Sequence, residues 1–147
     1  MHVRWTSVRA SDAGAPHPRE RLFIVATFPD APDLRFDGHG PARWRGDGFA
    51  DDSSPRVGWG DYANAVSHWE SIVCRPAPAP VEVGTKGQPR LSAEFAEWLM
   101  GLPAGWVTSP DIGLARTRQI SAIGNGVCPQ QAEFALRHLL PELERAK

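Results

Sequence analysis

The chain has 147 residues, enough for one domain with a core of its own, and its formal net charge of -1 excludes a global basic field for nucleic acid. The 14 glycines and 14 prolines predict much irregular chain, and the 6 tryptophans call for either a core or a partner surface. No apolar run reaches transmembrane length and the N-terminus lacks a signal-peptide core, so we expect a cytoplasmic protein without a membrane partner.

The first two predicted elements are strands. Residues 2–8 alternate in polarity, with Val3 and Trp5 on one face, as in a half-buried strand. The apolar run 22–26 predicts a second strand, and the Gly/Pro turn before it predicts an antiparallel ribbon. A lone ribbon is marginal in water, so we expect it to join a larger sheet.

Two arginines stand where the second strand begins. Arg19 and Arg21 are two residues apart, so in a strand both side chains leave the same face. Two adjacent guanidinium groups suit an anionic or carbonyl-bearing ligand. The alternative is a pair of surface arginines.

Residues 28–55 have no regular period and are rich in glycine, proline and aspartate. Basic and aromatic residues are interleaved there, which favours phosphate contacts and base stacking with nucleic acid. The alternative is a solvated variable loop. The DNA-binding candidates are Arg35, Arg43, Trp44 and Arg45.

Three helices are predicted in the remainder. The first covers residues 60–75 with Asp61 as its N-cap, and its tryptophan is expected in the core. The second covers residues 92–100 with Ser92 as its N-cap. The last is a strongly amphipathic helix with Pro129 in its first turn.

A Gly-Asn-Gly sequence precedes the last helix. Gly124 and Gly126 permit a positive φ or a close backbone approach, and Asn125 offers both donors and acceptors. Such a turn at the beginning of a helix can hold a polar ligand through its N–H groups. The alternative is a plain turn into the helix.

No catalytic constellation has convincing spacing. Cys74 and Cys128 lack metal-ligand spacing, and we expect two reduced thiols, with a single disulfide as the alternative. The histidines are too dispersed for a metal site, so none is predicted. They are His2, His17, His39, His68 and His138.

Three blocks in order carry a resemblance. In the first block Gly14, Pro16, Arg19 and Arg21 match a Gly-x-Pro-Gln-x-Arg-x-Arg pattern, with His17 in place of glutamine. The chain is similar in this block to the C-terminal portion of bacterial and phage cytosine-5 DNA methyltransferases.

The other two blocks resemble the same family. Residues 90–103 resemble the block after its target-recognition region, with Glu94-Phe95 where Arg-Glu is usual. Residues 119–131 resemble its last block, with Gly124-Asn125-Gly126-Val127 where Gly-Asn-Ser-Val is usual. Together the three blocks span nearly the whole chain.

The resemblance implies an α/β fold, the C-terminal part of a Rossmann-like methyltransferase domain with an inserted, loop-rich target-recognition region. Residues 1–27 would be catalytic-domain strands carrying the Arg-x-Arg block. Residues 28–88 would be the target-recognition region, which reads double-stranded DNA. Residues 89–147 would return to the catalytic domain.

The resemblance also implies roles. Arg19 and Arg21 would reach the target cytosine, which is swung out of the duplex. Gly124, Asn125 and Gly126 would line a partly present S-adenosylmethionine pocket, with one hydroxyl lost by the serine-to-glycine change.

The family's catalytic Pro-Cys block has no counterpart in this chain. Cys128 precedes Pro129, the reverse order, and Cys74 precedes Arg75. Methyl transfer to cytosine C5 needs a thiolate that attacks C6, so we expect no catalysis by this chain alone. The implied partner is an N-terminal methyltransferase polypeptide. The alternatives are a non-catalytic DNA-binding module and a truncated, inactive remnant.

Overall fold

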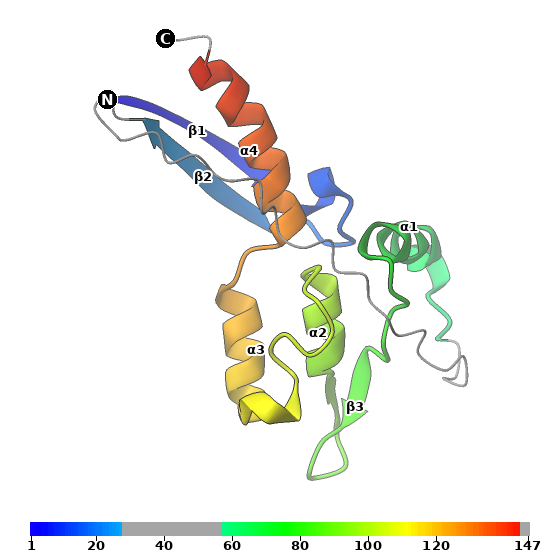
Figure 1. The fold of residues 1–147 in the computed structure, drawn as a ribbon. Coiled ribbons are helices and arrows are strands. Elements are labelled where there is room, and N and C mark those ends of the chain that lie inside the picture. Colours follow the sequence, from blue (N-terminus) through cyan, green and yellow to red (C-terminus); the bar gives the residue numbers. More distant parts are fainter. Residues whose placement is uncertain (28–56, 145–147) are drawn as a thin grey trace.

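The computed structural model describes residues 1–27 and 57–144 (Figure 1). Two long strands come first, a helix and a small hairpin follow, and three helices complete the chain. In chain order these elements are β1 (His2–Arg9), β2 (Glu20–Thr27), α1 (Ala63–Val73), β3 (Val81–Val83), β4 (Pro89–Leu91), α2 (Ala93–Leu99), α3 (Arg116–Asn125) and α4 (Pro129–Glu144).

The ribbon predicted at the N-terminus is confirmed. β1 and β2 pair antiparallel over their whole length, from His2 opposite Thr27 to Arg9 opposite Glu20. The helix α4 lies along one face of this ribbon (Figure 1). Its contact stripe is buried at every fourth residue, namely Gln131, Ala135 and Leu139.

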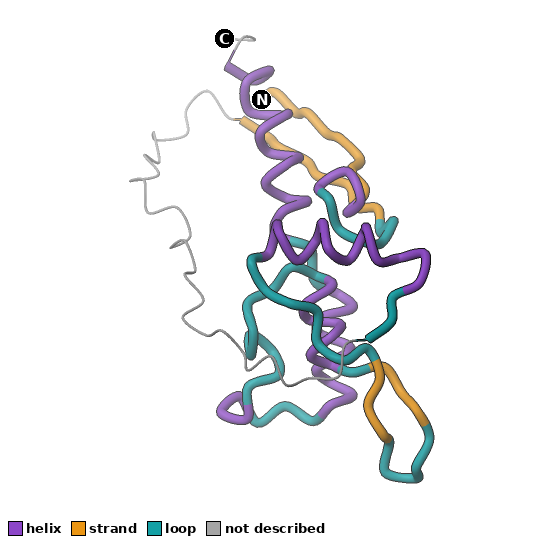
Figure 2. The backbone as a smooth tube through the Cα atoms, turned by 90° about the vertical axis from the view of Figure 1, so that its right-hand side faces the viewer, coloured by secondary structure: helices purple, strands orange, loops and turns teal. Residues whose placement is uncertain are grey.

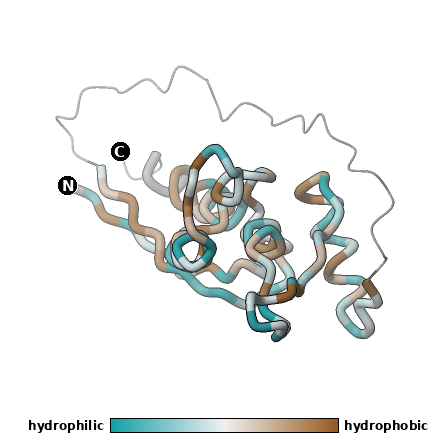
Figure 3. Tube along the Cα trace, turned by 90° about the horizontal axis from the view of Figure 1, so that it is seen from below, coloured by the Kyte–Doolittle hydropathy of each residue, from teal (hydrophilic) through white to brown (hydrophobic). Residues whose placement is uncertain are grey.

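The other face of the ribbon is apolar and faces solvent. Val3 and Trp5 on β1 are 47% and 68% exposed, and Leu22 and Ile24 on β2 are 56% and 63% exposed. Apolar residues recur along both strands in Figure 3. The predicted alternation is therefore present, but α4 packs on the face opposite to Trp5, and the four residues named above are exposed rather than buried.

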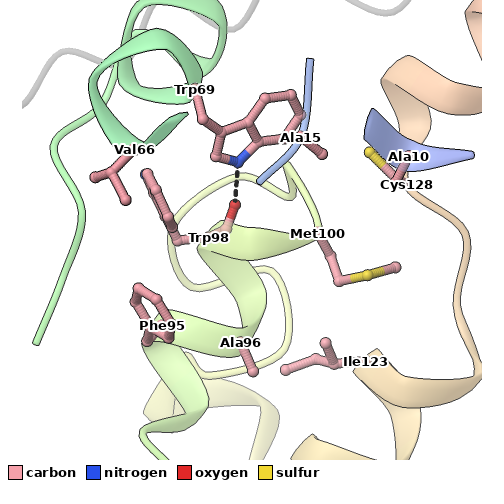
Figure 4. Close-up of a cluster of buried hydrophobic side chains, with 10 residues drawn as sticks. All are labelled: Ala10, Ala15, Val66, Trp69, Phe95, Ala96, Trp98, Met100, Ile123 and Cys128. Carbon is pink, nitrogen blue, oxygen red and sulfur yellow. Dashed lines mark hydrogen bonds between the residues drawn. The ribbon is translucent and has the colours of Figure 1, made fainter. Parts of the chain in front are cut away.

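The core is built around two tryptophans on α1 and α2. Trp69 and Trp98 are both 0% exposed (Figure 4). Trp69 Nε1 donates to the carbonyl of Trp98 at 3.0 Å, and Trp98 Nε1 donates to the carbonyl of Arg75 at 3.1 Å. A buried indole needs such a partner for its N–H. The predicted core position of Trp69 is confirmed.

The two predicted N-caps have different outcomes. Ser92 caps α2, because its Oγ accepts the N–H of Phe95 at 3.1 Å. Asp61 does not cap α1. It lies in a 3-10 turn, Gly60–Tyr62, and α1 begins after that turn without a side-chain cap. The aspartate therefore starts a tighter turn than the predicted α-helix.

A hairpin that the sequence did not predict connects α1 to α2. β3 and β4 pair antiparallel, with Val81 opposite Leu91, and they project away from the helices (Figure 2). The boundary expected between residues 88 and 89 falls inside this hairpin. Each strand has only three residues, too few for a periodic signal.

Glu97 is a buried carboxylate that holds the loop after α2. It is 1% exposed and accepts the backbone N–H groups of Gly105, Val107 and Thr108 at 2.9, 2.6 and 3.2 Å. The hydroxyl of Thr108 donates to it at 2.9 Å. A buried charge is tolerated when several donors satisfy it, so this loop is fixed to α2.

The strands of the described residues form two separate antiparallel pairs. The Rossmann-like parent domain therefore stays a prediction. No described helix is both long and apolar enough to cross a membrane.

Replacing Glu97 by glutamine should lower the free energy of unfolding by about 2–3 kcal/mol, because one carboxylate oxygen becomes an N–H₂ group that faces N–H donors. Urea unfolding followed by tryptophan fluorescence measures this. Glu94→Gln, on the exposed side of the same helix, is the control and should cost less than about 1 kcal/mol. Equal losses in the two variants would contradict the assigned role of Glu97.

Candidate functional site

Arg19 joins the first and the last of the three sequence blocks. Its Nη2 donates to the carbonyl of Gly124 at 2.5 Å and to that of Gly126 at 2.7 Å. Nη2 carries two hydrogens, so both are used. Its Nη1 lies 3.6 Å from the sulfur of Met100 at the end of α2. One side chain therefore ties the N-terminal ribbon to α2 and α3.

The Gly/Pro turn that carries Arg19 toward β2 is fixed by close packing. Gly14 has a φ of +88°, and a Cβ built on it would lie 2.3 Å from Cδ1 of Ile72 on α1. The backbone conformation therefore favours glycine, and any other residue would also have to displace the end of the Ile72 side chain. The N–H of Ala10 donates to the carbonyl of Arg19 at 2.8 Å and closes the turn.

The Gly-Asn-Gly sequence is not a turn at the beginning of a helix, and that prediction was wrong. Gly124 and Asn125 end α3, a helix that the sequence did not predict, and Gly126 follows with a φ of −70°. The N–H of Gly126 is used within this helix end, by the carbonyls of Ala122 and Ile123. The groups presented to Arg19 are carbonyls rather than N–H groups.

This arrangement follows from the electrostatics of a helix end. The last carbonyls of an α-helix lack intrahelical partners, and they carry a partial negative charge. The guanidinium of Arg19 supplies both the donors and the positive charge. The sequence predicts that Arg19 suits a carbonyl-bearing ligand. In the structure its guanidinium binds carbonyls of the protein's own backbone.

A pocket of about 220 Å³ opens beside Arg19. Its polar lining comes from Arg19, His17 and the end of α3 at Gly124, and its other walls are apolar. At this size it suits a single ring rather than a complete drug-sized ligand. The apolar lining residues are Leu91, Ala96, Leu99, Met100, Ile120 and Ile123.

His17, which replaces the glutamine of the Gly-x-Pro-Gln-x-Arg-x-Arg pattern, lies on the wall of this pocket. Its Nε2 is 3.0 Å from the carbonyl of Leu99. Burial lowers the pKa of His17, the charge of Arg19 lowers it further, and the bond to Leu99 opposes both. A neutral imidazole that donates from Nε2 fits this environment.

Arg21 is less engaged than Arg19. Among the described residues, its guanidinium has one hydrogen bond, from Nη1 to the carbonyl of Glu20 at 2.9 Å. Burial lowers the pKa of Arg19, and the charge of Arg21 lowers it further, so the two cations are neighbours as the spacing predicted. Arg19 remains protonated, as arginines do in proteins. Arg21 does not line the pocket beside Arg19.

The two cysteines are unpaired, so the predicted free thiols are confirmed. Cys74 is exposed at the end of α1. Cys128 is buried, and burial raises the pKa of its thiol, although its hydrogen bonds and the charge of Arg19 act in the other direction. Because burial is the largest cause, Cys128 is a poor nucleophile despite its place near Arg19.

Four predicted DNA-binding residues lie outside the described part of the chain. These residues are Arg35, Arg43, Trp44 and Arg45. Sequence reasoning in turn missed Met100 and Gln131, which both contact Arg19. A polar residue inside the otherwise apolar stripe of α4 was the available signal for Gln131.

Comparison with known proteins gives no relative. No protein-family model, no curated protein and no solved structure matches the chain.

Stability should depend on pH through His17. The unfolded chain takes up a proton near the usual value of 6.5, whereas the folded chain resists protonation because its pKa is lowered. The free energy of unfolding should therefore fall as the pH is lowered from about 7.5 to about 5. Urea unfolding at several pH values measures this slope.

His17→Gln should reduce that slope, because glutamine keeps a donor for Leu99 and does not titrate. His138→Gln, on the exposed face of α4, should leave the slope unchanged. A slope that survives in His17→Gln would exclude His17 as its cause.

Proposed function

We propose that the chain is the C-terminal part of a DNA (cytosine-5-)-methyltransferase that contributes target-base contacts, DNA recognition and part of an S-adenosylmethionine pocket. The observation that carries the proposal is the double hydrogen bond from Arg19 to Gly124 and Gly126. It joins the two blocks to which the resemblance gives neighbouring roles, although about a hundred residues separate them.

The two arginines would have different roles. Arg19 has both hydrogens of Nη2 on backbone carbonyls, so it braces the end of α3. Arg21 keeps most of its donors for a ligand, since its one hydrogen bond within the described residues goes to its neighbour's carbonyl. In this role Arg21 would bind the carbonyl of a cytosine that has left the duplex and lost its base pair.

The cofactor would lie against the end of α3. The pocket beside Arg19 is lined by Gly124 and by apolar side chains, which suits one ring of a cofactor such as S-adenosylmethionine. When bound, the cofactor supplies the methyl group. The residues of this chain would hold it and exclude water on one side.

The attacking thiolate would come from a second polypeptide. Cys128 is 0% exposed with a raised pKa, and Cys74 lies at the end of α1, where its Sγ is 3.6 Å from the carbonyl of Ser71. Neither combines access with activation, which a nucleophilic cysteine needs.

The surface of the ribbon supports such a partner. β2 has a continuous apolar run, Leu22 to Ala26, which is typical of strands that helices cover on both faces of a sheet. In this chain α4 covers one face only, and Trp5 and Ile24 stand exposed on the other. The partner would extend the ribbon into a larger sheet and cover these residues.

The test is complementation. The chain is mixed with a polypeptide that carries the family's Pro-Cys block, and transfer of tritiated methyl groups to DNA is measured. We expect transfer from the mixture and none from this chain alone. A soluble, associated pair without transfer would refute the proposal.

In the active pair, Arg21→Ala should lower the transfer rate by about 100-fold or more, because a preorganised donor to the reacting base is lost. Arg137→Ala is the matched control, since its side chain is 79% exposed on α4 and pairs with Glu133. It should leave the rate within about two-fold. Equal effects of the two changes on the transfer rate would contradict the assigned role of Arg21.

DNA binding by residues 28–55 is tested separately. Replacing Arg35, Arg43 and Arg45 by alanine should weaken binding and reduce the salt slope by about 1 for each phosphate that these arginines neutralise. Gel-shift titration of duplex DNA at several salt concentrations measures both quantities. An unchanged slope would exclude phosphate binding by these arginines. DNA binding without methyl transfer in any pairing would favour a non-catalytic DNA-binding module.

A further inference from the structure

A buried glutamine lies at the junction of the ribbon, α4 and Arg19. The side chain of Gln131 is 0% exposed and belongs to the first turn of α4. Its Nε2 donates to the carbonyl of Val8 at 2.6 Å and to the carbonyl of Arg19 at 3.0 Å. Both hydrogens of Nε2 are therefore used, one on the end of β1 and one on the residue before β2.

This amide leaves one of its own polar atoms unsatisfied. Its Oε1 is buried and has no hydrogen-bond partner among the described residues. A buried oxygen without a donor is unfavourable, and a methionine of similar length would remove this oxygen together with the donors to Val8 and Arg19. What the amide adds is direction, because its two bonds hold the carbonyl of Arg19, which also accepts the N–H of Ala10, at a fixed place relative to the carbonyl of Val8.

The position of that backbone matters because it determines where the guanidinium of Arg19 can lie. It must reach the carbonyls of Gly124 and Gly126 with one nitrogen, at 2.5 and 2.7 Å. Its Nε is buried without a partner in the described residues, so no further bond holds the middle of the side chain. A backbone shift at Arg19 would therefore directly change the geometry of the two hydrogen bonds to the carbonyls of Gly124 and Gly126.

We propose that Gln131 is a positioning residue for Arg19 and, through Arg19, for the end of α3 at Gly124–Gly126. The relay runs from the amide of Gln131 to the carbonyl of Arg19, and from the guanidinium of Arg19 to the two glycine carbonyls. The inference deepens the methyltransferase proposal and rests on it only for what the site binds.

The test uses the full chain labelled with ¹⁵N. The signal of Arg19 Nε–H is assigned by its loss in Arg19→Lys, and its exchange with water is measured. In Gln131→Met we expect this signal to shift and its exchange to become about ten-fold faster, because loss of the bond to the Arg19 carbonyl loosens the side chain. The amide signal of Gly126 should shift as well.

Two controls separate positioning from general loosening. Gln130→Met makes the same substitution one residue earlier, where the amide binds the carbonyl of Gly101 at 3.3 Å, and it should leave the Arg19 signal in place. Leu139→Ala removes a buried side chain under the ribbon and should lower the unfolding midpoint without a selective change at Arg19. An unchanged Arg19 signal in Gln131→Met, or equal changes in all three variants, would overturn the inference.

The unaltered chain gives a second measurement that needs no folded variant. The side-chain amide protons of Gln131 should exchange at least about ten-fold more slowly than those of the exposed Gln88. Equal rates would overturn the inference. None of these readouts uses DNA, cofactor or a partner, so a failure of methyl transfer and a failure of the relay are distinguishable.

Discussion

The attachment of one guanidinium to the carbonyl end of α3 is the interaction on which the arrangement of this chain depends. Arg19 belongs to the N-terminal ribbon, whereas Gly124 and Gly126 belong to the C-terminal third, and these two bonds join them. A charged donor suits the partly negative end of a helix, so the interaction combines hydrogen bonding with dipole stabilisation. Gln131 and Met100 both contact Arg19, and the pocket lies beside it.

The elements that sequence reasoning recovered are those with a strong period or a clear cap. The two long strands, the cap at Ser92 and the last helix from Pro129 follow from alternation, side-chain capping and amphipathicity. What it missed lacks such a signal. The helix α3 is polar on most of its surface, with Arg116 and Arg118 in its first turn, and the strands of the small hairpin have three residues each.

Three residues singled out in the sequence lie together in the structure, but their chemistry differs from the prediction. Arg19, Gly124 and Gly126 do meet, but the direction of the peptide groups could not be read from the sequence, because it depends on whether the glycines begin or end a helix. Ile120 and Ile123 lie on α3 and line the pocket, although no predicted element contained them. Long-range hydrogen bonds such as that from Gln131 to Arg19 have no local signal.

The end of α1 has a practical consequence for handling the protein. Cys74 is exposed and adopts a φ of +52°, which among the described residues only glycines otherwise share. The thiol of Cys74 is therefore exposed at a helix end, while Cys128 is buried. Air oxidation should therefore cross-link two molecules through a single position, and a maleimide dye should attach at that same position and at no other described cysteine.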